Sequence, residues 1–275
     1  MIFLCNLKHT IYAIILGMNQ KIFIGVMAHK KALMPSNPIY VPIEVGADFR
    51  NEHFYKCLDN TGDNISNKNA SYCELTGAYW AYRNNEYEYF GIAHYRRFLM
   101  KSFFCKKSLD NIIGEKEIEK TLEKYDFILP AKVVMVIHTN YLHYILAHKK
   151  EGLKVTEDII KTDYPKYYKS YKKVMRRVYG HYFNMFVAKK ETANAYLDWL
   201  FELLGKVEKR IDLDEYIGQD KRVFGYIAEL MLDVYIDANK LKYKEFRFAC
   251  MDKHYIWNMF KGYIKSKFKK NKCKR

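Results

Sequence analysis

The amino-acid sequence predicts an α/β domain, because strand-like and helix-like segments alternate along the chain. Continuous apolar runs, such as residues 22–27, are typical of strands that are covered on both faces. Polar residues cluster at the ends of three of the predicted strands, after Met27, Ala93 and Phe183. Ligands of open α/β sheets bind beyond the carboxyl ends of strands, so we expect these polar segments to meet at one site.

Composition and charge exclude some classes of protein but do not identify a single function. The 275 residues suffice for one large domain, and no internal repeat or linker divides them. Lys and Arg number 47 against 31 Asp and Glu, and the net charge of +16 favours anionic partners such as nucleic acid, anionic lipid or phosphate-bearing small molecules. The six cysteines include no Cys-x-x-Cys pair, which argues against a zinc module and a disulfide scaffold. No apolar run reaches the roughly 20 residues of a membrane span.

The two ends of the chain differ from the domain between them. Residues 1–17 contain apolar runs interrupted by polar residues, unlike a signal peptide, and Met18 leads directly into the first strand. We interpret residues 1–17 as an extension or a mis-assigned start, with a membrane-contacting peptide as the alternative. Residues 18–254 form the predicted domain, and residues 255–275 form a basic tail.

The tail has a pattern that is typical of contact with an anionic membrane surface. From Lys261 onward every charged residue is basic, and three apolar residues share roughly one helical face: Tyr263, Ile264 and Phe268. Basic residues near an anionic leaflet each contribute about 1 kcal/mol of binding free energy. A disordered solubilising tail is the alternative interpretation.

The domain opens with two predicted strands. The first, over residues 22–27, ends at the basic turn Ala28-His29-Lys30-Lys31, where a nucleotide phosphate could bind. Pro35 and Pro38 then enforce an extended loop. Residues 39–45 are predicted to form a second short strand.

A single buried helix is predicted over residues 70–83, because apolar side chains cover it nearly all round. Glu74 lies in this helix, so its carboxylate is expected to be buried and to need a partner, which Arg96 or Arg97 could supply. A strand is predicted next, over residues 88–94.

The second half of the chain continues the alternation. Helices are predicted over residues 106–125, 141–150, from Pro165 onward, 191–204 and 222–238. Strands are predicted over residues 126–129, 181–188 and 243–249. Asn184 interrupts an apolar strand, so its side chain is expected to bond a neighbouring backbone or to face a ligand. His143 and His148 lie five residues apart and do not share a helix face well, which argues against a metal pair.

Several long motifs, in order along about residues 21–237, resemble the DUF4422 family of bacterial capsular, exopolysaccharide and O-antigen glycosyltransferases. The motifs cover residues 40–46, 63–69, 72–76, 79–80, 91–98, 184–186, 199–201 and 222–229. The resemblance implies a GT-A-like, Rossmann-type single domain with a mixed central sheet flanked by helices. It also implies transfer of a hexose, with galactose or galactofuranose as candidates, from a UDP-sugar to a growing lipid-linked glycan. Such an enzyme would be cytoplasmic and peripheral on the inner face of the bacterial membrane.

The sequence departs from the wider GT-A pattern at the expected diphosphate site. Many GT-A enzymes hold a divalent metal on an Asp-x-Asp motif, but the comparable strand here ends in His94-Tyr95-Arg96-Arg97. Arg96 and Arg97 could neutralise a leaving diphosphate through bidentate hydrogen bonds, so we expect no metal cofactor to be required. The loop carboxylates of Asp59 and Asp63 could still hold Mg or Mn.

Inverting transfer needs a general base, and four carboxylates are candidates: Asp63, Glu74, Asp220 and Glu229. A structural ion pair with Arg222 or another arginine is the alternative role for Glu229, and a structural clamp is the alternative for Glu74. Asp220, in a loop before a helix, is therefore expected to be better placed for chemistry than Glu229. Retaining transfer would need no base, and the sequence leaves the two outcomes open. The residues expected to bind the donor are polar groups at strand ends and in the loop: His29, Lys30, Asn64, Ser66, Asn67, His94, Tyr95 and Asn184.

Two other functions are alternatives to a UDP-sugar enzyme. A non-enzymatic polyanion or nucleic-acid-binding protein would fit the charge, but the basic residues form no recognised motif and most aromatic residues fall on core stripes. We therefore expect no nucleic-acid partner. A nucleotidyl- or phosphotransferase would use a Gly-rich phosphate loop, which the sequence lacks.

Overall fold

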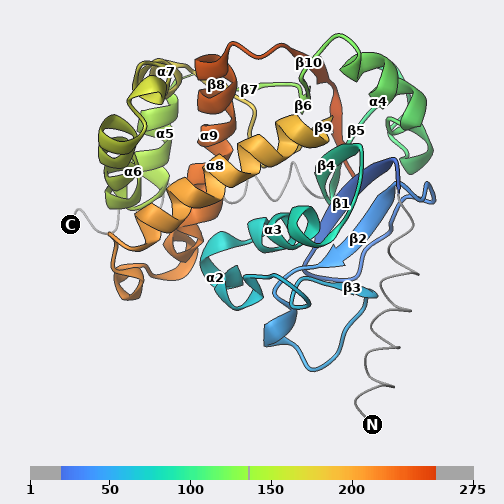
Figure 1. Ribbon diagram of the computed structural model, residues 1–275, viewed down its shortest axis with the longest axis horizontal. Coiled ribbons are helices and arrows are strands. Elements are labelled where there is room, and N and C mark those ends of the chain that lie inside the picture. Colours follow the sequence, from blue (N-terminus) through green and yellow to red (C-terminus); the bar gives the residue numbers. More distant parts are fainter. Residues whose placement is uncertain (1–19, 136, 252–275) are drawn as a thin grey trace.

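The computed structural model describes residues 20–135 and 137–251. Within this part of the chain, nine strands form one mixed sheet: β1 (Ile22–Ala28), β2 (Tyr40–Glu44), β3 (Cys57–Leu58), β4 (Tyr89–His94), β5 (Arg97–Leu99), β6 (Phe127–Pro130), β9 (Phe186–Lys189), β10 (Tyr243–Phe246) and β11 (Phe248–Cys250). Their order across the sheet is β10-β6-β9-β4-β1-β2-β3 (Figure 1). In addition, β5 pairs with β4, and β11 pairs with β5.

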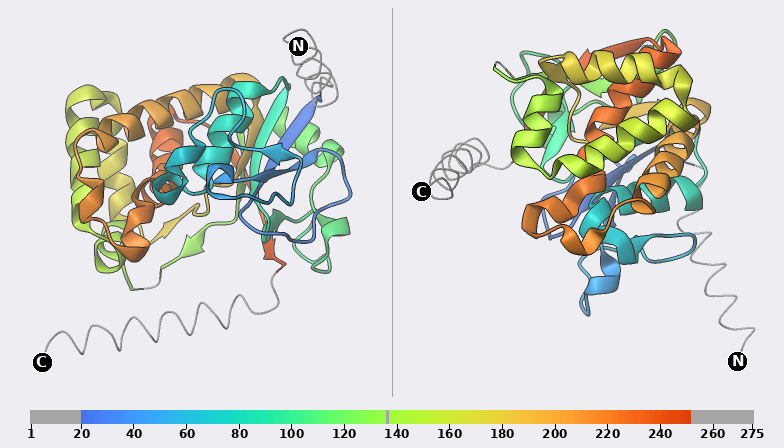
Figure 2. Two further views of the ribbon diagram at one scale, coloured as in Figure 1. Left: turned by 90° about the horizontal axis from the view of Figure 1, so that it is seen from below. Right: turned by 90° about the vertical axis from the view of Figure 1, so that its left-hand side faces the viewer.

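The described helices lie on both sides of this sheet (Figure 1 and Figure 2). They are α2 (Asn69–Tyr72), α3 (Leu75–Asn84), α4 (Glu115–Leu122), α5 (Asn140–Ala147), α6 (Lys150–Asp163), α7 (Pro165–Arg176), α8 (Lys190–Glu208) and α9 (Val223–Asn239). A small separate sheet pairs β7 (Val133–Val134) with β8 (Tyr179–Gly180). None of the described helices is both long and apolar enough to cross a membrane.

The strand β1, which lies between β4 and β2, separates two hydrophobic cores, because its side chains alternate between the faces of the sheet. Phe23 and Met27 belong to one core, which α3, α8 and α9 cover, whereas Ile24 and Val26 belong to the other, which α4 covers. Burial on both faces explains why the first strand is a continuous apolar run. The predicted α/β domain with a mixed sheet flanked by helices is confirmed.

Strand pairing brings three chain segments to one edge of the sheet. β1 is parallel to β2 and to β4, and Met27 lies opposite His94. β9 is antiparallel to β4, so the start of β9 lies beside the end of β4. The residues after β1, after β4 and before β9 therefore share this edge.

The predicted single helix over residues 70–83 is wrong, because Cys73 divides it into α2 and α3. Cys73 has φ 54° and ψ −128°, a conformation that residues other than glycine rarely adopt. The Asn69 side-chain amide donates to the Cys73 carbonyl oxygen at 2.7 Å. This side-chain bond stabilises a turn that the apolar pattern alone does not reveal.

Three other predicted elements also differ from the structure. The strand over residues 181–188 begins only at β9, because Phe183 and Asn184 turn the chain with φ of 80° and 52°. The strand over residues 243–249 is divided into β10 and β11 at Arg247. The Arg247 guanidinium donates a hydrogen bond to the Phe103 carbonyl oxygen. In place of the predicted helix over residues 106–125, the structure has a short 3-10 helix, η3 (Leu109–Asn111), followed by α4. At the start of α4, the Gly114 N–H donates to the Glu117 carboxylate.

The remaining element predictions agree with the structure to within a few residues. The strand over residues 126–129 corresponds to β6, and the helices over residues 141–150, 191–204 and 222–238 correspond to α5, α8 and α9. The interpretations of residues 1–17 and 255–275 lie outside the described residues.

Candidate functional site

A cleft, which we name the strand-end cleft, lies where β1 and β4 end. Its described lining comes from the two strand ends, the α2–α3 break and the residue before α9: Met27, His29, Val45, Asn69, Ala70, Cys73, Glu74, His94, Arg96 and Arg222. The parallel pairing of β1 with β4 sets the rings of His29 and His94 with their centroids 6.5 Å apart. Three residues predicted from the polar strand ends, His29, His94 and Arg96, therefore lie in one cleft.

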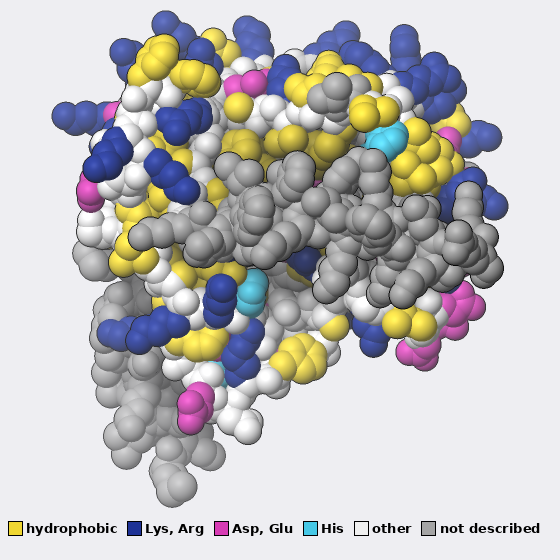
Figure 3. Space-filling view, turned by 180° about the vertical axis from the view of Figure 1, so that it is seen from behind, with side chains coloured by type: hydrophobic (Ala, Val, Ile, Leu, Met, Phe, Trp, Pro, Cys, Tyr) yellow, Lys and Arg dark blue, Asp and Glu magenta, His cyan; other side chains and the backbone are white. Residues whose placement is uncertain are grey.

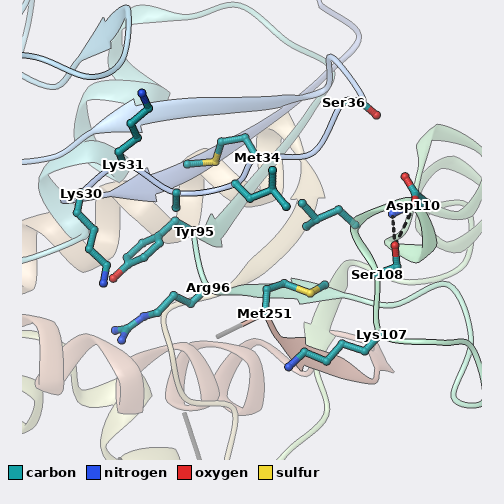
Figure 4. A pocket seen from close by; sticks show the side chains of 13 residues that line it. Lys30, Lys31, Met34, Ser36, Tyr95, Arg96, Lys107, Ser108, Asp110 and Met251 are labelled. Carbon is teal, nitrogen blue, oxygen red and sulfur yellow. Dashed lines mark hydrogen bonds between the residues drawn. The ribbon is translucent and has the colours of Figure 1, made fainter. Parts of the chain in front are cut away.

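A second and larger cleft, which we name the basic cleft, adjoins the first (Figure 4). It has a volume of about 660 Å³, and three lysines line it: Lys30, Lys31 and Lys107. Arg96 lines both clefts, so the two meet at its side chain. Lys and Arg side chains are also spread over the described part of the face shown in Figure 3, as expected from the net charge of +16.

Lys30, Tyr95 and Arg96 form a junction between the two clefts. The Lys30 ammonium and the Arg96 guanidinium lie 5.7 and 5.1 Å from the centroid of the Tyr95 ring. In Figure 4 the ends of these three side chains converge. Arg96 Nε is buried and has no hydrogen-bond partner within the described residues. Two cations held on one aromatic ring, with a donor unused, suit an anionic ligand.

The histidines of the strand-end cleft are held in their neutral forms. Burial lowers the pKa of His94 to about 2, and the charges of Arg97 and Arg96 add to this effect. Burial also lowers the pKa of His29, again with help from nearby cations. His94 Nδ1 accepts the Arg96 N–H at 3.3 Å, so the proton of the neutral ring is assigned to Nε2. His94 can therefore donate a hydrogen bond to a ligand but does not add a positive charge.

Arg97 occupies a different place from Arg96, because it starts β5. Its guanidinium lies 4.3 Å from the centroid of the Phe183 ring. Arg97 does not belong to the described lining of either cleft. Its charge nevertheless lowers the pKa values of His94 and Glu229, so Arg97 acts on the site electrostatically.

Glu74 and Asn184 connect the α2–α3 break to the turn before β9. The Asn184 amide donates to Glu74 Oε1 at 2.8 Å and to the Gly225 carbonyl at 3.1 Å. The hydrogen-bond partner of Glu74 is thus Asn184, where the sequence predicted Arg96 or Arg97. The left-handed turn at Asn184 explains the difference, because it carries the amide across to the helix break.

Glu229 is the candidate base whose protonation changes near neutral pH. Its pKa is raised to about 7, mainly by burial and also by the neighbouring Glu74, and a bond from the Phe183 N–H to Glu229 Oε1 at 3.2 Å opposes the rise. The alternative ion pair with Arg222 is not formed, because Arg222 Nε points to the Cys73 sulfur at 3.1 Å. A carboxylate with a pKa near 7 is well suited to general-base catalysis.

Asp220 and Cys73 are less suited to chemistry. Asp220 lies in the short helix η5 (Gly218–Arg222), and its carboxylate is 3.6 Å from His148 Nδ1. It lines neither cleft within the described residues. Burial raises the pKa of the Cys73 thiol to about 11, so this side chain is a thiol rather than a nucleophilic thiolate at neutral pH.

The chain matches one family model and is similar to a solved structure. A family model described as a domain of unknown function, DUF4422, matches residues 22–240. The chain belongs to the DUF4422 family. It is also similar to the apo structure of WbbM, a bifunctional glycosyltransferase, with 31% identity and a TM-score of 0.75 over 85% of this chain and 46% of that one. This likeness confirms the GT-A-like fold, although the chain spans only about half the length of WbbM. The search of curated proteins found no match to this chain.

In this DUF4422 chain the loop carboxylates have structural partners. Asp59 is fully buried, and its oxygens accept four hydrogen bonds, from Gly46 N, Ala47 N, Ser66 Oγ and Thr76 Oγ1. Asp63 is exposed, and its carboxylate forms an ion pair with Arg83 at 2.7 Å. In the described ranges, no group of three or more His, Cys, Asp or Glu side chains could hold a metal ion.

Asp59 and Asp63 are expected to differ sharply in their effect on stability. Asp59→Ala should lower the free energy of unfolding by at least about 3 kcal/mol, because it leaves several buried donors without an acceptor. Asp63→Ala, the matched control, should lower it by less than about 1 kcal/mol, since its ion pair is exposed. Urea unfolding measures both values. Equal, small losses would contradict the structural role of Asp59.

The other loop residues predicted to bind a donor lie away from the two clefts. Ser66 is buried against Asp59, and its backbone N–H donates to Asn64 Oδ1 at 3.2 Å. Asn67 is exposed. Neither cleft includes these three residues in its described lining.

Sequence reasoning missed several residues that line the strand-end cleft. Cys73 and Asn69 are not among the predicted site residues, although a polar residue four positions before a cysteine could have signalled a side-chain cap. Arg222 was considered only as a partner for Glu229. Arg222 lies directly before an apolar helix, and this position could have indicated a residue near the strand ends.

Proposed function

We propose that the chain transfers a hexose from a UDP-sugar to a growing lipid-linked glycan, with galactose or galactofuranose as the candidate sugars. The observation that carries the proposal is the junction of Lys30, Tyr95 and Arg96, which gathers two cations at the carboxyl ends of parallel strands. A diphosphate is the part of a nucleotide sugar that such a junction would bind. The fold shared with a glycosyltransferase supports the same reaction class.

The donor is proposed to lie across the junction. The nucleoside would occupy the basic cleft, whose volume of about 660 Å³ is typical of a cofactor site. The diphosphate would contact Arg96 and Lys30. The sugar would then enter the strand-end cleft, near Glu74 and Arg222.

The reaction is proposed to be an inverting displacement. The acceptor hydroxyl oxygen would form a bond to the anomeric carbon while the bond from that carbon to UDP breaks. Glu229 would take the hydroxyl proton, and Arg96 would stabilise the charge that develops on the departing diphosphate. The anomeric configuration of the product, read by NMR, distinguishes this course from a retaining one.

We also propose that this transfer requires no metal ion. Arg96, Lys30 and Arg222 supply positive charge at the two clefts, whereas Asp59 is engaged by four donors and Asp63 by Arg83. The initial rate of UDP release is therefore expected to be unchanged by EDTA. Complete inhibition that Mn²⁺ reverses would show that a metal is used.

The test of the proposed function is direct product analysis. The protein is incubated with lipid-linked glycans and a panel of UDP-sugars, and the glycans are analysed by mass spectrometry. A mass gain of one hexose with one donor, together with release of UDP, is expected. Salt-sensitive RNA binding without affinity for UDP would instead support the polyanion-binding alternative.

The location of the reaction is also a proposal. A lipid-linked acceptor lies at a membrane, so we propose that the protein acts peripherally on the cytoplasmic face of the bacterial membrane. The basic tail, residues 255–275, is proposed to contact anionic lipid there. This part of the proposal rests on the sequence, because the tail lies outside the described residues.

A further inference from the structure

A third cavity, which we name the aromatic cavity, lies between α5 and α9 and has a volume of about 220 Å³. Its described lining is Val133, Met135, Asn140, His143, Tyr144, His148, Tyr182, Phe183, Tyr226, Glu229 and Leu230. Aromatic rings form much of its wall, and no Lys or Arg belongs to this lining. The cavity therefore suits a neutral ligand that offers both apolar faces and hydroxyl groups.

The aromatic cavity and the strand-end cleft are neighbours along one face of α9 and the residue before it. Arg222, Tyr226 and Glu229 are spaced by four and three residues, so they lie on the same side of the helix. Arg222 lines the strand-end cleft, Tyr226 and Glu229 line the aromatic cavity, and the Arg222 guanidinium is 5.3 Å from the centroid of the Tyr226 ring. A ligand in one site would thus face a ligand in the other across Tyr226 and Glu229.

The wall of the cavity carries a stacking platform. The His148 ring lies parallel to the Tyr226 ring, with centroids 3.8 Å apart and planes at 23°. This stacking holds the Tyr226 ring in a fixed orientation. An aromatic face of this kind packs against the C–H groups of a sugar ring, whose hydroxyls then point outward to polar partners.

Polar groups without protein partners also line the cavity. Tyr144 is 3% exposed, and its hydroxyl has no hydrogen-bond partner among the described residues. Burying a hydroxyl without a hydrogen bond is costly, so a ligand or water is expected to satisfy it. The Glu229 carboxylate supplies an acceptor at the same wall, where its Oε1 also accepts the Phe183 N–H. A polyhydroxylated ring matches this combination of one donor, one carboxylate and an aromatic face.

We propose that the aromatic cavity binds the terminal sugar of the acceptor glycan and presents one of its hydroxyls to Glu229. The proposal rests on the proposed glycosyltransferase function, and it adds the position of the acceptor and the residues that select it. The cavity is small, so it holds a single sugar ring, and the rest of the glycan extends outward. The absence of cations from the described lining separates this site from the donor diphosphate at Arg96.

The experiment compares Tyr226→Leu and Tyr144→Phe with the wild-type protein. Octyl glycosides of galactose, glucose and N-acetylglucosamine serve as acceptor probes, and their binding without donor is followed by saturation-transfer NMR. At least one glycoside is expected to bind the wild type through its ring protons. Tyr226→Leu should weaken that binding at least tenfold and raise the acceptor KM by a similar factor, and Tyr144→Phe should weaken it severalfold.

Tyr168→Leu is the matched control, because Tyr168 is also a half-buried helical tyrosine but lies on α7 and its hydroxyl bonds Glu157. It should leave glycoside binding unchanged. Calorimetric titration with UDP should give the same dissociation constant for the wild type and Tyr144→Phe, since the donor lies elsewhere. Transfer by the wild type with unaltered glycoside binding in both cavity variants would overturn the acceptor site alone. Absence of UDP binding and of transfer in the wild type would overturn the proposed function, and glycoside binding would then still report on the cavity.

Discussion

Replacing Arg96 with alanine is expected to reduce kcat for sugar transfer by about 100- to 1,000-fold, which corresponds to about 2.7–4 kcal/mol of transition-state stabilisation. The reason is the position of Arg96 between the two clefts, with Nε unbonded within the described residues. A charged donor at this point would stabilise the diphosphate most strongly as it departs. Initial rates of UDP release with saturating donor and acceptor measure the effect.

Arg83→Ala is the matched control for Arg96→Ala. Arg83 is another arginine of the same region of sequence, but its side chain is exposed and pairs with Asp63. Its replacement should leave kcat unchanged, and both variants should melt within a few degrees of the wild type. Normal turnover by Arg96→Ala would remove Arg96 from the mechanism and, with it, the proposed position of the diphosphate.

Glu229→Gln is expected to lower kcat by about 100- to 10,000-fold, the usual contribution of a general base. In the wild type, the pKa of Glu229 is raised to about 7, mainly by burial. The rate should therefore increase with pH up to about 7 and level off above it, because only the carboxylate accepts a proton. Glu229→Gln should lose this dependence. A wild-type rate that is flat between pH 5 and 8 would contradict the assignment.

The same carboxylate also predicts a pH dependence of stability. The pKa is about 7 in the folded state against 4.5 for an ordinary glutamate, so the folded state holds the proton more tightly. The stabilisation from the protonated form is complete below about pH 4.5 and is lost as the pH rises through about 7. Relative to Glu229→Gln, the wild type should thus melt at progressively lower temperature as the pH is raised over this range. A constant difference in melting temperature would indicate an ordinary pKa.

Much of the fold could be predicted because its signals are local. The residues before His29 form a continuous apolar run, which is typical of a strand covered on both faces. The apolar residues of α8 and α9 recur with the helical period, so these helices can be predicted without any knowledge of their neighbours. The exceptions are positions where side chains bond the backbone across a turn, as Asn69 does at Cys73. Such bonds depend on a three-dimensional turn that hydrophobic periodicity does not encode.

The candidate site was partly predictable for a related reason. His94 ends β4, and Tyr95 and Arg96 follow it directly, so topology alone places them at the ligand edge of the sheet. Asp59 and Ser66 have the same polar character in sequence, yet they bond each other in a buried network. Residue type indicates that a group needs a partner, but it does not indicate whether the partner is protein or ligand.

The sequence by itself determined the alternation of strands and helices, the family, and the gathering of polar residues at strand ends. Only the tertiary structure decided which of these residues face an open cleft: it separated Arg96 from Arg97, gave Glu74 an amide partner, and placed Glu229 beside an aromatic cavity. The physical reason is that strand and helix propensities act between near neighbours in the chain. Burial, hydrogen-bond partners and pKa shifts instead arise between segments that meet only when the sheet and its helices pack.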